Sequence, residues 1–334
     1  MNSLRQNTPN MSGKKIMYEQ TDVLDDWVEH FRGFSTKGQC ASYIPALKNA
    51  NPYQLGICVI GPDGQMKKSG DWQSTFTLQS ISKTISFISA CMDFGIDYVL
   101  ERVDVEPTGD AFNSIIRLEM NNSGKPFNPM INAGALTVSS LLGERTPNEK
   151  IDSICSLISR IIGKNPSVNE EVFLSEWNHS HRNRSIAHYL KETGYLESSV
   201  DETLEVYLKQ CSIEVNSEDL AMIGLVLAQD GYQPFKQKQI FSKEVARLTK
   251  ALMVTCGMYN ASGKYAAFIG VPAKSGVSGG IMGAAAARDR LESTHFQNGC
   301  GIGIYGPAID EYGNSVAGAM LLKKISEEWD LNIF

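Results

Sequence analysis

The chain has 334 residues, of which 42% are hydrophobic and 20% are charged, a balance that excludes an intrinsically disordered protein. Acidic residues outnumber basic ones by 37 to 31 and leave a net charge of −6. Because no overall positive field attracts phosphates, we expect no nucleic-acid partner. The most apolar stretch, residues 276–287, is too short to cross a bilayer, so we expect no membrane partner either.

The seven cysteines are widely spaced and form no Cys-x-x-Cys pair. This spacing favours buried, free thiols in a reducing compartment. Residues 1–15 are polar and lack the apolar stretch of a secretory signal. We therefore expect a cytoplasmic protein with a disordered polar tail over residues 1–15.

In the first third of the chain, the spacing of apolar residues predicts first a helix, then two strands and then a second helix. Residues 16–33 have the apolar spacing of an amphipathic helix. Residues 55–60 predict a strand, and the turn sequence at 61–64 predicts that a polar strand returns beside it as a hairpin. From Ile81 the spacing becomes helical again, and it predicts a helix that ends at Gly95.

Helical periodicity dominates the middle of the chain, from about residue 148 to 257, without a convincing alternating pattern. It predicts helices over residues 151–162, 184–192, 218–229 and 243–255. Two glycine-rich apolar runs at 277–282 and 300–305 then predict strands. A closing helix is predicted over residues 316–329.

Strands near both termini with helices between them predict an α+β fold. We expect one antiparallel sheet, assembled from the two ends of the chain and flanked by terminal helices, plus a mostly helical subdomain. The predicted domain over residues 16–334 comprises a discontinuous α/β part (about 16–80 and 258–334) and a helical part (about 81–257).

The sequence Ser80-Ile-Ser-Lys83 places a serine at a strand-to-helix junction and a lysine one turn along the same face. A lysine that burial or a cationic neighbour keeps neutral can accept the serine's proton. The alternative is a chance match, since Ser12 and Lys15 in the polar tail have the same spacing. The junction distinguishes Ser80, because helix N–H groups there stabilise developing negative charge.

A second candidate is Lys274-Ser-Gly276, because a Lys-Ser/Thr-Gly strand accompanies Ser-x-x-Lys in penicillin-recognising enzymes. Lys68-Ser-Gly70 has the same letters, but it belongs to the predicted hairpin and precedes the candidate nucleophile. Order along the chain therefore favours Lys274. The alternative interpretation is a sheet edge that is merely rich in glycine.

Other patterns are weaker. The run Gly301-Ile-Gly-Ile-Tyr-Gly306 matches the dinucleotide fingerprint, but Pro307 follows and no helix opens there, so a strand and a turn are expected. His179, His181 and His188 cluster without a spacing that completes a metal site, and we expect no metal or other cofactor. No Gly-x-Ser-x-Gly motif supports a Ser-His-Asp hydrolase.

The chain resembles the serine-dependent glutaminases, within the β-lactamase/penicillin-binding superfamily, from about residue 38 to 318. The resemblance rests on ordered motifs, which are Tyr43-Ile-Pro45, Leu78-Gln-Ser-Ile-Ser-Lys83, Asn128-Pro-Met-Ile-Asn-Ala-Gly-Ala135, Ser175-Glu176, Arg182-Asn183, Cys211-Ser-Ile-Glu214, Cys256-Gly-Met-Tyr259 and Pro272-Ala-Lys-Ser-Gly-Val277. It implies a β-lactamase/penicillin-binding-like fold and the short bacterial type of glutaminase.

The resemblance also implies site residues and chemistry. Ser80 is the implied nucleophile toward the side-chain amide of L-glutamine, with Lys83 and Tyr259 as proton-transfer partners and the backbone N–H groups of Ser80 and Val277 holding the oxyanion. The implied products are L-glutamate and ammonia. The implied substrate-binding residues are Tyr43, Ser80, Asn132, Glu176, Asn183, Tyr207, Tyr259 and Val277. From charge, we assign Glu176 to the α-ammonium group and the asparagines to the α-carboxylate.

Two other functions remain open at this stage. A penicillin-interacting hydrolase or transpeptidase would share Ser80, Lys83 and Lys274, whereas a non-catalytic binding module would keep the pocket without turnover. Related enzymes form dimers or tetramers, so the resemblance implies a homo-oligomer.

Overall fold

The centre of the molecule is a five-stranded antiparallel sheet with the strand order β2-β1-β9-β8-β7. The computed structural model describes residues 23–120, 123–143, 146–288 and 295–334. The strands are β1 (Gly56–Ile60), β2 (Met66–Gly70), β7 (Ala273–Ser275), β8 (Gly280–Ala285) and β9 (Cys300–Tyr305). The predicted hairpin and the sheet assembled from both ends of the chain are therefore confirmed. The predicted tail over residues 1–15 lies outside the described residues.

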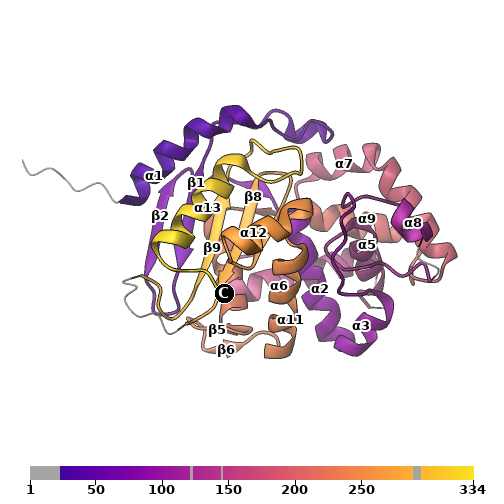
Figure 1. The fold of residues 1–334 in the computed structure, drawn as a ribbon. Helices are drawn as coiled ribbons and strands as arrows, with labels where there is room; N and C mark the ends of the chain where they lie inside the picture. The colour runs from indigo at the N-terminus through magenta and orange to yellow at the C-terminus, as the bar shows by residue number, and fades with distance from the viewer. Residues whose placement is uncertain (1–22, 121–122, 144–145, 289–294) are drawn as a thin grey trace, which may run out of the picture.

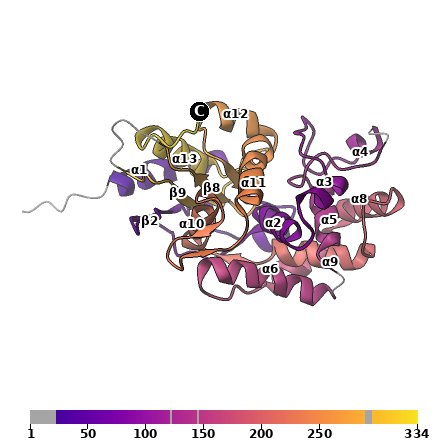
Figure 2. The same ribbon diagram turned by 90° about the horizontal axis from the view of Figure 1, so that it is seen from below.

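Helices cover both faces of this sheet (Figures 1 and 2). The terminal helices α1 (Val23–Arg32) and α13 (Val316–Glu328) pack against each other. The ring centroid of Trp27, in α1, lies 6.1 Å from that of Trp329, the residue after α13. Helix α10 (Ser217–Ala228) packs against the other face, on strands β8 and β9. The expectation of terminal helices flanking the sheet is confirmed.

A group of helices lies beside the sheet and forms the rest of the molecule (Figure 1). Its helices are α2 (Ser82–Phe94), α3 (Ile96–Arg102), α4 (Ile116–Met120), α5 (Asn132–Leu141), α6 (Pro147–Ile162), α7 (Glu170–His179), α8 (His181–Glu192), α9 (Val200–Cys211) and α11 (Lys243–Cys256). Short helix α12 (Ser262–Phe268) leads back to the sheet. Helix α2 ends where Gly95 adopts a φ of 83°, in agreement with the prediction.

Short two-stranded pairs interrupt the helical middle of the chain. They are β3 (Phe76–Thr77) with β4 (Glu214–Val215), and β5 (Tyr232–Gln233) with β6 (Lys238–Gln239). The sequence pattern did not predict β4, β5 or β6, because strands of two residues are too short to show an alternating pattern.

Helix α10 approaches the sheet more closely than side chains would normally allow. A Cβ atom on Gly301 or Gly303 would lie 1.9 Å from the carbonyl oxygen of Ala221 or Ser217, respectively, and one on Gly224 would lie 2.1 Å from that of Gly283. The glycines of the fingerprint-like run thus serve helix packing, and β9 is a strand as expected. Because α10 falls within residues 81–257 but packs on the sheet, the division into two parts stays a prediction.

The strand predicted over residues 277–282 is present as β8, but it begins three residues later than predicted. Strand β7 ends at Ser275 and β8 begins at Gly280, so the intervening residues form a turn. The Gly279 N–H donates to the carbonyl of Gly276, and Gly279 adopts a φ of 98°. Hydrophobicity alone does not reveal this left-handed residue, which reverses the chain.

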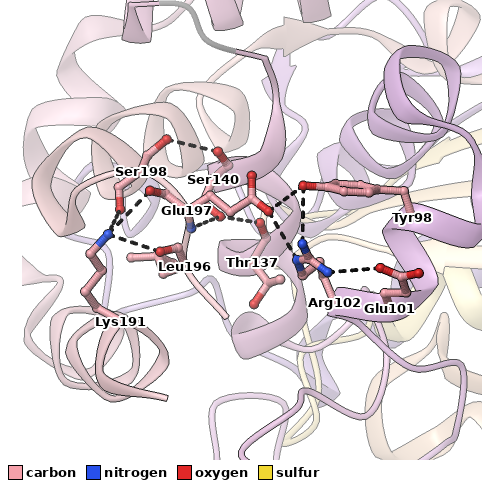
Figure 3. A network of polar contacts seen from close by, with 9 residues as sticks. All are labelled: Tyr98, Glu101, Arg102, Thr137, Ser140, Lys191, Leu196, Glu197 and Ser198. Atoms are coloured by element: carbon pink, nitrogen blue, oxygen red, sulfur yellow. Dashed lines mark hydrogen bonds and ion pairs between the residues drawn. The ribbon is translucent and has the colours of Figure 1, made fainter. Parts of the chain in front are cut away.

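A network of polar contacts fastens the C-terminal end of α5 to α3 and to the segment before α9 (Figure 3). Ser140 Oγ accepts from the Glu197 N–H at 3.1 Å, and the Ser198 hydroxyl donates to the Ser140 carbonyl at 2.9 Å. The Glu197 carboxylate accepts from Tyr98 and Arg102 of α3 at 2.8 and 3.1 Å. These contacts hold the C-terminal end of α5, the helix whose first residue is Asn132.

The seven cysteines are all free. Cys58, Cys91, Cys211 and Cys300 are buried, whereas Cys40, Cys155 and Cys256 are only partly buried. The expectation of free thiols is therefore confirmed, and the expectation that all of them are buried is wrong. No helix among the described residues is long and apolar enough to span a bilayer.

Candidate active site

A pocket of about 190 Å³ opens where the sheet meets the group of helices. Its lining brings together residues from distant parts of the sequence, namely Tyr43, Ser80, Asn132, Glu176, Asn183, Tyr207 and Val277. Each comes from a different helix, turn or loop. Lys83 and Tyr259 are buried next to this pocket, at 0% and 8% exposure. The fold therefore gathers every residue that the sequence analysis assigned to the site.

Ser80 lies in a 3₁₀ turn, Gln79–Ile81, that leads directly into α2. It is 7% exposed and lines the pocket, so its hydroxyl is accessible to a small ligand. The turn places Ser80 at the N-terminal end of α2, where the helix dipole favours negative charge.

Lys83 is completely buried one turn further along α2. Its Nζ donates to Asn132 Oδ1 at 2.7 Å and to the carbonyl of Met130 at 3.3 Å. Neither of these hydrogen bonds goes to Ser80. Burial lowers the pKa of Lys83 to about 8, against a smaller opposing effect of Cys211 and Glu176. A substantial share of the lysine is thus neutral near pH 8 and able to accept a proton.

Asn132 connects Lys83 with the residues on the opposite wall. Its Oδ1 accepts from Lys83 and, at 3.3 Å, from the Tyr207 hydroxyl. Its Nδ2 donates to Asn183 Oδ1 at 2.9 Å. Because Asn132 begins α5 and its own N–H donates to the Phe112 carbonyl, both its backbone and its side chain are held.

Glu176 supplies the pocket's carboxylate from α7. Gln79 Nε2 donates to Glu176 Oε1 at 2.7 Å. Burial raises the pKa of Glu176 to about 7, although the Gln79 hydrogen bond and the charge of Lys83 act in the opposite direction. Gln79 is 3% exposed and adopts a φ of 48°, in the left-handed region, which turns its side chain toward Glu176.

Tyr259 lies behind the pocket in a 3₁₀ turn, Tyr259–Ala261, also with a left-handed φ, of 51°. Its hydroxyl has no hydrogen-bond partner of good geometry among the described residues, yet Ser80 is near enough to lower its pKa. Burial has the larger effect and raises the pKa of Tyr259 well above its usual range. Phe112 packs against it, with the ring centroids 4.9 Å apart.

Lys274, in β7, is the other buried lysine of the site. Its Nζ lies 4.5 Å from the centre of the Tyr259 ring and donates to the Ser275 carbonyl at 2.6 Å. Burial and the charge of Lys83 hold the pKa of Lys274 well below its usual range. Lys68 instead pairs with Glu218 at 2.8 Å on β2, the edge strand of the sheet. The choice of Lys274 over Lys68 thus agrees with their positions.

Val277 lies in the turn between β7 and β8 and lines the pocket. Two hydrogen bonds close this turn, from the N–H of Gly276 to Gly280 and from the N–H of Gly279 to Gly276. Neither uses the Val277 N–H. Gly276 lets the turn lie against the nucleophile's own segment, because a Cβ there would be 2.6 Å from the Leu78 carbonyl.

Tyr43 stands at the mouth of the pocket and is 56% exposed. A tyrosine phenol is neutral near pH 7 and able to donate a hydrogen bond to a bound ligand.

The sequence analysis missed several residues that line the pocket, and three of them make contacts that shape it. They are Gln79, which holds Glu176; Phe112, which packs on Tyr259; and Arg182, whose Nε donates to the Asn113 carbonyl at 2.9 Å. Gln79 and Arg182 lie inside the quoted motifs, so proximity to Ser80 and Asn183 was a usable signal. No sequence signal identified Phe112.

No group of three or more histidine, cysteine or acidic side chains is placed to hold a metal ion in the described part of the chain. Of the three clustered histidines, only His179 lines the pocket, and its Nδ1 is 2.7 Å from the Ser175 carbonyl. That histidine caps the end of its own helix.

Comparison with known proteins identifies the family. The Glutaminase family model matches residues 38–334. The chain is 67% identical to Glutaminase 2 of Bacillus cereus, over 97% of this chain and 99% of that protein. It is 64% identical to Glutaminase 1 of Bacillus subtilis, over 93% and 95%, respectively.

Solved structures agree with this match. A crystal structure of a probable glutaminase from Bacillus subtilis superimposes with a TM-score of 0.88 at 62% identity, covering 93% of this chain and 97% of the other. Another, with a TM-score of 0.85 at 59% identity, covers 93% and 99%. It is a covalent complex of a Bacillus subtilis glutaminase with 5-oxo-L-norleucine, formed by reaction with 6-diazo-5-oxo-L-norleucine.

An antiparallel sheet with flanking terminal helices and an adjoining helical region defines a β-lactamase-like fold, as expected. The serine at the start of α2 and the buried lysine one turn later stand where that fold opens its pocket. The chain belongs to the glutaminase family, and it is an amidohydrolase.

Proposed function

We propose that this protein hydrolyses the side-chain amide of L-glutamine to L-glutamate and ammonia through an acyl-enzyme on Ser80. The observation that carries the proposal is the pairing of an accessible serine with a fully buried lysine whose pKa is lowered to about 8. Ser80 Oγ attacks the γ-carbonyl carbon while its proton passes to Lys83 or Tyr259. The oxyanion rests on the N–H groups of Ser80 and Val277.

Lys83 and Tyr259 return the proton to the departing nitrogen, and ammonia leaves. Water then attacks the Ser80 ester, with the neutral lysine again accepting a proton, and glutamate is released. Tyr259 relays the proton between Ser80 and Lys83, since its buried phenol has no hydrogen-bond partner of good geometry among the described residues and Ser80 is near enough to lower its pKa.

The polar wall of the pocket suits a small zwitterion. Glu176 pairs with the α-ammonium group, while Tyr43 and Asn183 face the α-carboxylate as hydrogen-bond donors. Tyr207 joins them when its hydroxyl hydrogen turns from Asn132 to the ligand. Asn132 orients Asn183 through its Nδ2 and has a second amide hydrogen for the ligand. This arrangement favours a free amino acid over a penicillin, which has no α-ammonium group. The cytoplasmic location and the dimer or tetramer stay predictions.

The proposal is tested by treating the protein with 6-diazo-5-oxo-L-norleucine and digesting it for mass spectrometry, alongside an assay of glutamate and ammonia formed from L-glutamine. We expect one label, on the peptide that contains Ser80, and parallel loss of glutaminase activity. Protection by excess L-glutamate identifies the pocket. A label confined to a cysteine or lysine peptide would contradict the assigned nucleophile, and the absence of both label and turnover would leave only a binding module.

Replacing Glu176 with glutamine tests the assigned partner of the α-ammonium group. Loss of a charge-assisted hydrogen bond, worth about 1.5–3 kcal/mol, lowers kcat/KM for L-glutamine by roughly 10- to 150-fold. Because the Glu176 carboxyl has its pKa raised to about 7, it pairs with the substrate only when deprotonated, so wild-type kcat/KM rises as pH passes upward through 7. In Glu176→Gln, kcat/KM no longer shows this rise as pH increases through 7. Unchanged kcat/KM in Glu176→Gln would contradict the assignment.

A further inference from the structure

A second pocket, of about 290 Å³, adjoins the catalytic pocket and shares Tyr43, Phe112 and Val277 with it. The rest of its wall comes from residues 39–42 and from the loop over residues 309–313. Both segments are anchored to each other, because Gln39 and Ile309 exchange backbone hydrogen bonds of 3.1 and 3.0 Å. The space is therefore bounded by fixed backbone on both sides.

The second pocket lies on the leaving-group side of the reaction that we propose for Ser80. Of the groups assigned to the amino-acid end, Asn132, Glu176, Asn183 and Tyr207 line only the catalytic pocket, whereas Tyr43 stands between the two pockets and lines both. Val277, whose N–H is assigned to the oxyanion, lines both. A substituent on the amide nitrogen extends away from the α-carbon of the substrate, and the second pocket is a space that adjoins the catalytic pocket at Val277.

The loop over residues 309–313 also lies against the proposed proton donor. A Cβ placed on Gly313 would be 3.2 Å from both Tyr259 Cε2 and Val277 Cγ1. Ile309, Ala41, Tyr259 and Val277 form one buried hydrophobic cluster. The nitrogen that accepts a proton from Tyr259 is therefore close to the wall of the second pocket.

The charged side chains in the wall of this pocket are all negative. Asp310 and Glu311 belong to its wall, which contains no lysine or arginine. Neither carboxylate has an ion-pair partner within the part of the chain that the structure describes. Asp310 Oδ1 accepts from the backbone N–H groups of Tyr312 and Asn314, both at 2.9 Å, which fixes the loop, and Glu311 is exposed.

The remaining wall is suited to methylene groups next to a cation. Ala41 and Ile309 are buried apolar side chains, and Tyr312 and Phe112 contribute aromatic rings. Aromatic faces and carboxylates both attract an ammonium group, whereas a carboxylate-bearing substituent would be repelled.

We propose that this second pocket holds the amine portion of N-substituted γ-amides of L-glutamate and prefers alkylamines that carry a second, positively charged amino group. The inference rests on the proposed function. Ser80 Oγ forms an ester with the γ-carbonyl carbon, the C–N bond breaks, and the nitrogen leaves as the free amine with the proton that Ser80 gave up. Water then cleaves the ester and releases L-glutamate.

A matched pair of substrates tests this proposal. The γ-(4-aminobutyl)amide and the γ-pentylamide of L-glutamate differ only by a terminal ammonium in place of a methyl group. The full-length protein is assayed with each for glutamate release at low ionic strength. We expect kcat/KM to favour the aminobutyl amide by about fivefold, in line with the attraction of partly exposed charges, and this ratio to fall at high salt.

The variant Glu311→Gln removes one carboxylate while Asp310 continues to fix the loop. We expect the ratio between the two amides to fall to about half or less, whereas Glu192→Gln, an exposed carboxylate on α8 outside both pockets, keeps the wild-type ratio. Equal use of the two amides, or a ratio insensitive to Glu311→Gln, overturns the charge preference. Failure to cleave either amide while L-glutamine is hydrolysed overturns the pocket assignment but leaves the proposed function intact. Failure with all three substrates counts against the proposed function itself.

Discussion

Replacing Ser80 with alanine is expected to reduce glutamate formation from L-glutamine by about 10⁴-fold or more, because no other accessible nucleophile lies at the start of α2. The hydroxyl is a small part of the pocket wall, and alanine fits the space it leaves. The variant should therefore keep the wild-type thermal unfolding temperature and still bind L-glutamate.

Loss of turnover with retained binding and stability would show that the substitution removes a catalytic group and does not unfold the protein. Steady-state assays with coupled detection of glutamate, circular dichroism melts and calorimetry with L-glutamate measure the three quantities. Ser82→Ala is the matched control, since Ser82 is two residues away, is completely buried and donates to the Gln79 carbonyl instead of facing the pocket. A Ser80→Ala protein with substantial turnover would refute the acyl-enzyme.

Replacing Lys83 with methionine is expected to lower kcat by about 10² to 10⁴, the usual contribution of a general base. Methionine fills the channel of the lysine side chain without a proton acceptor, so the loss should persist at every pH. In the wild-type protein the lysine accepts a proton only when neutral. Because burial lowers its pKa to about 8, activity should rise as pH increases through 8 and then level off.

Measuring kcat from pH 6 to 10 in both proteins checks this assignment. Loss of the rise near pH 8 in Lys83→Met, with a weak and nearly flat profile, supports Lys83 as the group that titrates. Lys68→Met is the control, since that lysine pairs with Glu218 at the edge strand and should leave the profile unchanged. Retention of the full rise in Lys83→Met would assign the titration to another group.

Local signals were sufficient to predict much of the fold. The hairpin of β1 and β2, the helix that ends at Gly95 and strand β9 each depend on neighbouring residues, and the structure contains all three. The strand predicted over 277–282 begins only at Gly280, because the turn at Gly279 depends on a backbone angle that hydrophobicity does not encode. The packing of α10 on the sheet depends on glycines from two distant segments, which a one-dimensional pattern cannot pair.

The residues of the candidate site also fall into those that local sequence can predict and those that it cannot. Ser80 and Lys83 could be proposed from spacing within one helix turn, whereas Asn132, Glu176 and Tyr259 were proposed only through family resemblance. The hydrogen bond between Gln79 and Glu176 joins residues that are 97 positions apart. Partners at such separations are set by the packing of α9 against both α7 and the turn that contains Gln79, which local sequence does not specify.

The left-handed backbone at Gln79 and Tyr259 places conformational strain on both sides of the reacting serine. Such conformations cost a bulky residue of the order of 1 kcal/mol, and glycine at either position would relieve the cost. Yet glycine would remove either the amide that steadies the pocket's acid or the phenol beside the nucleophile. Selection or engineering for heat resistance thus meets opposing demands at these two positions. The glycine substitutions that would relieve backbone strain there would also abolish catalytic activity.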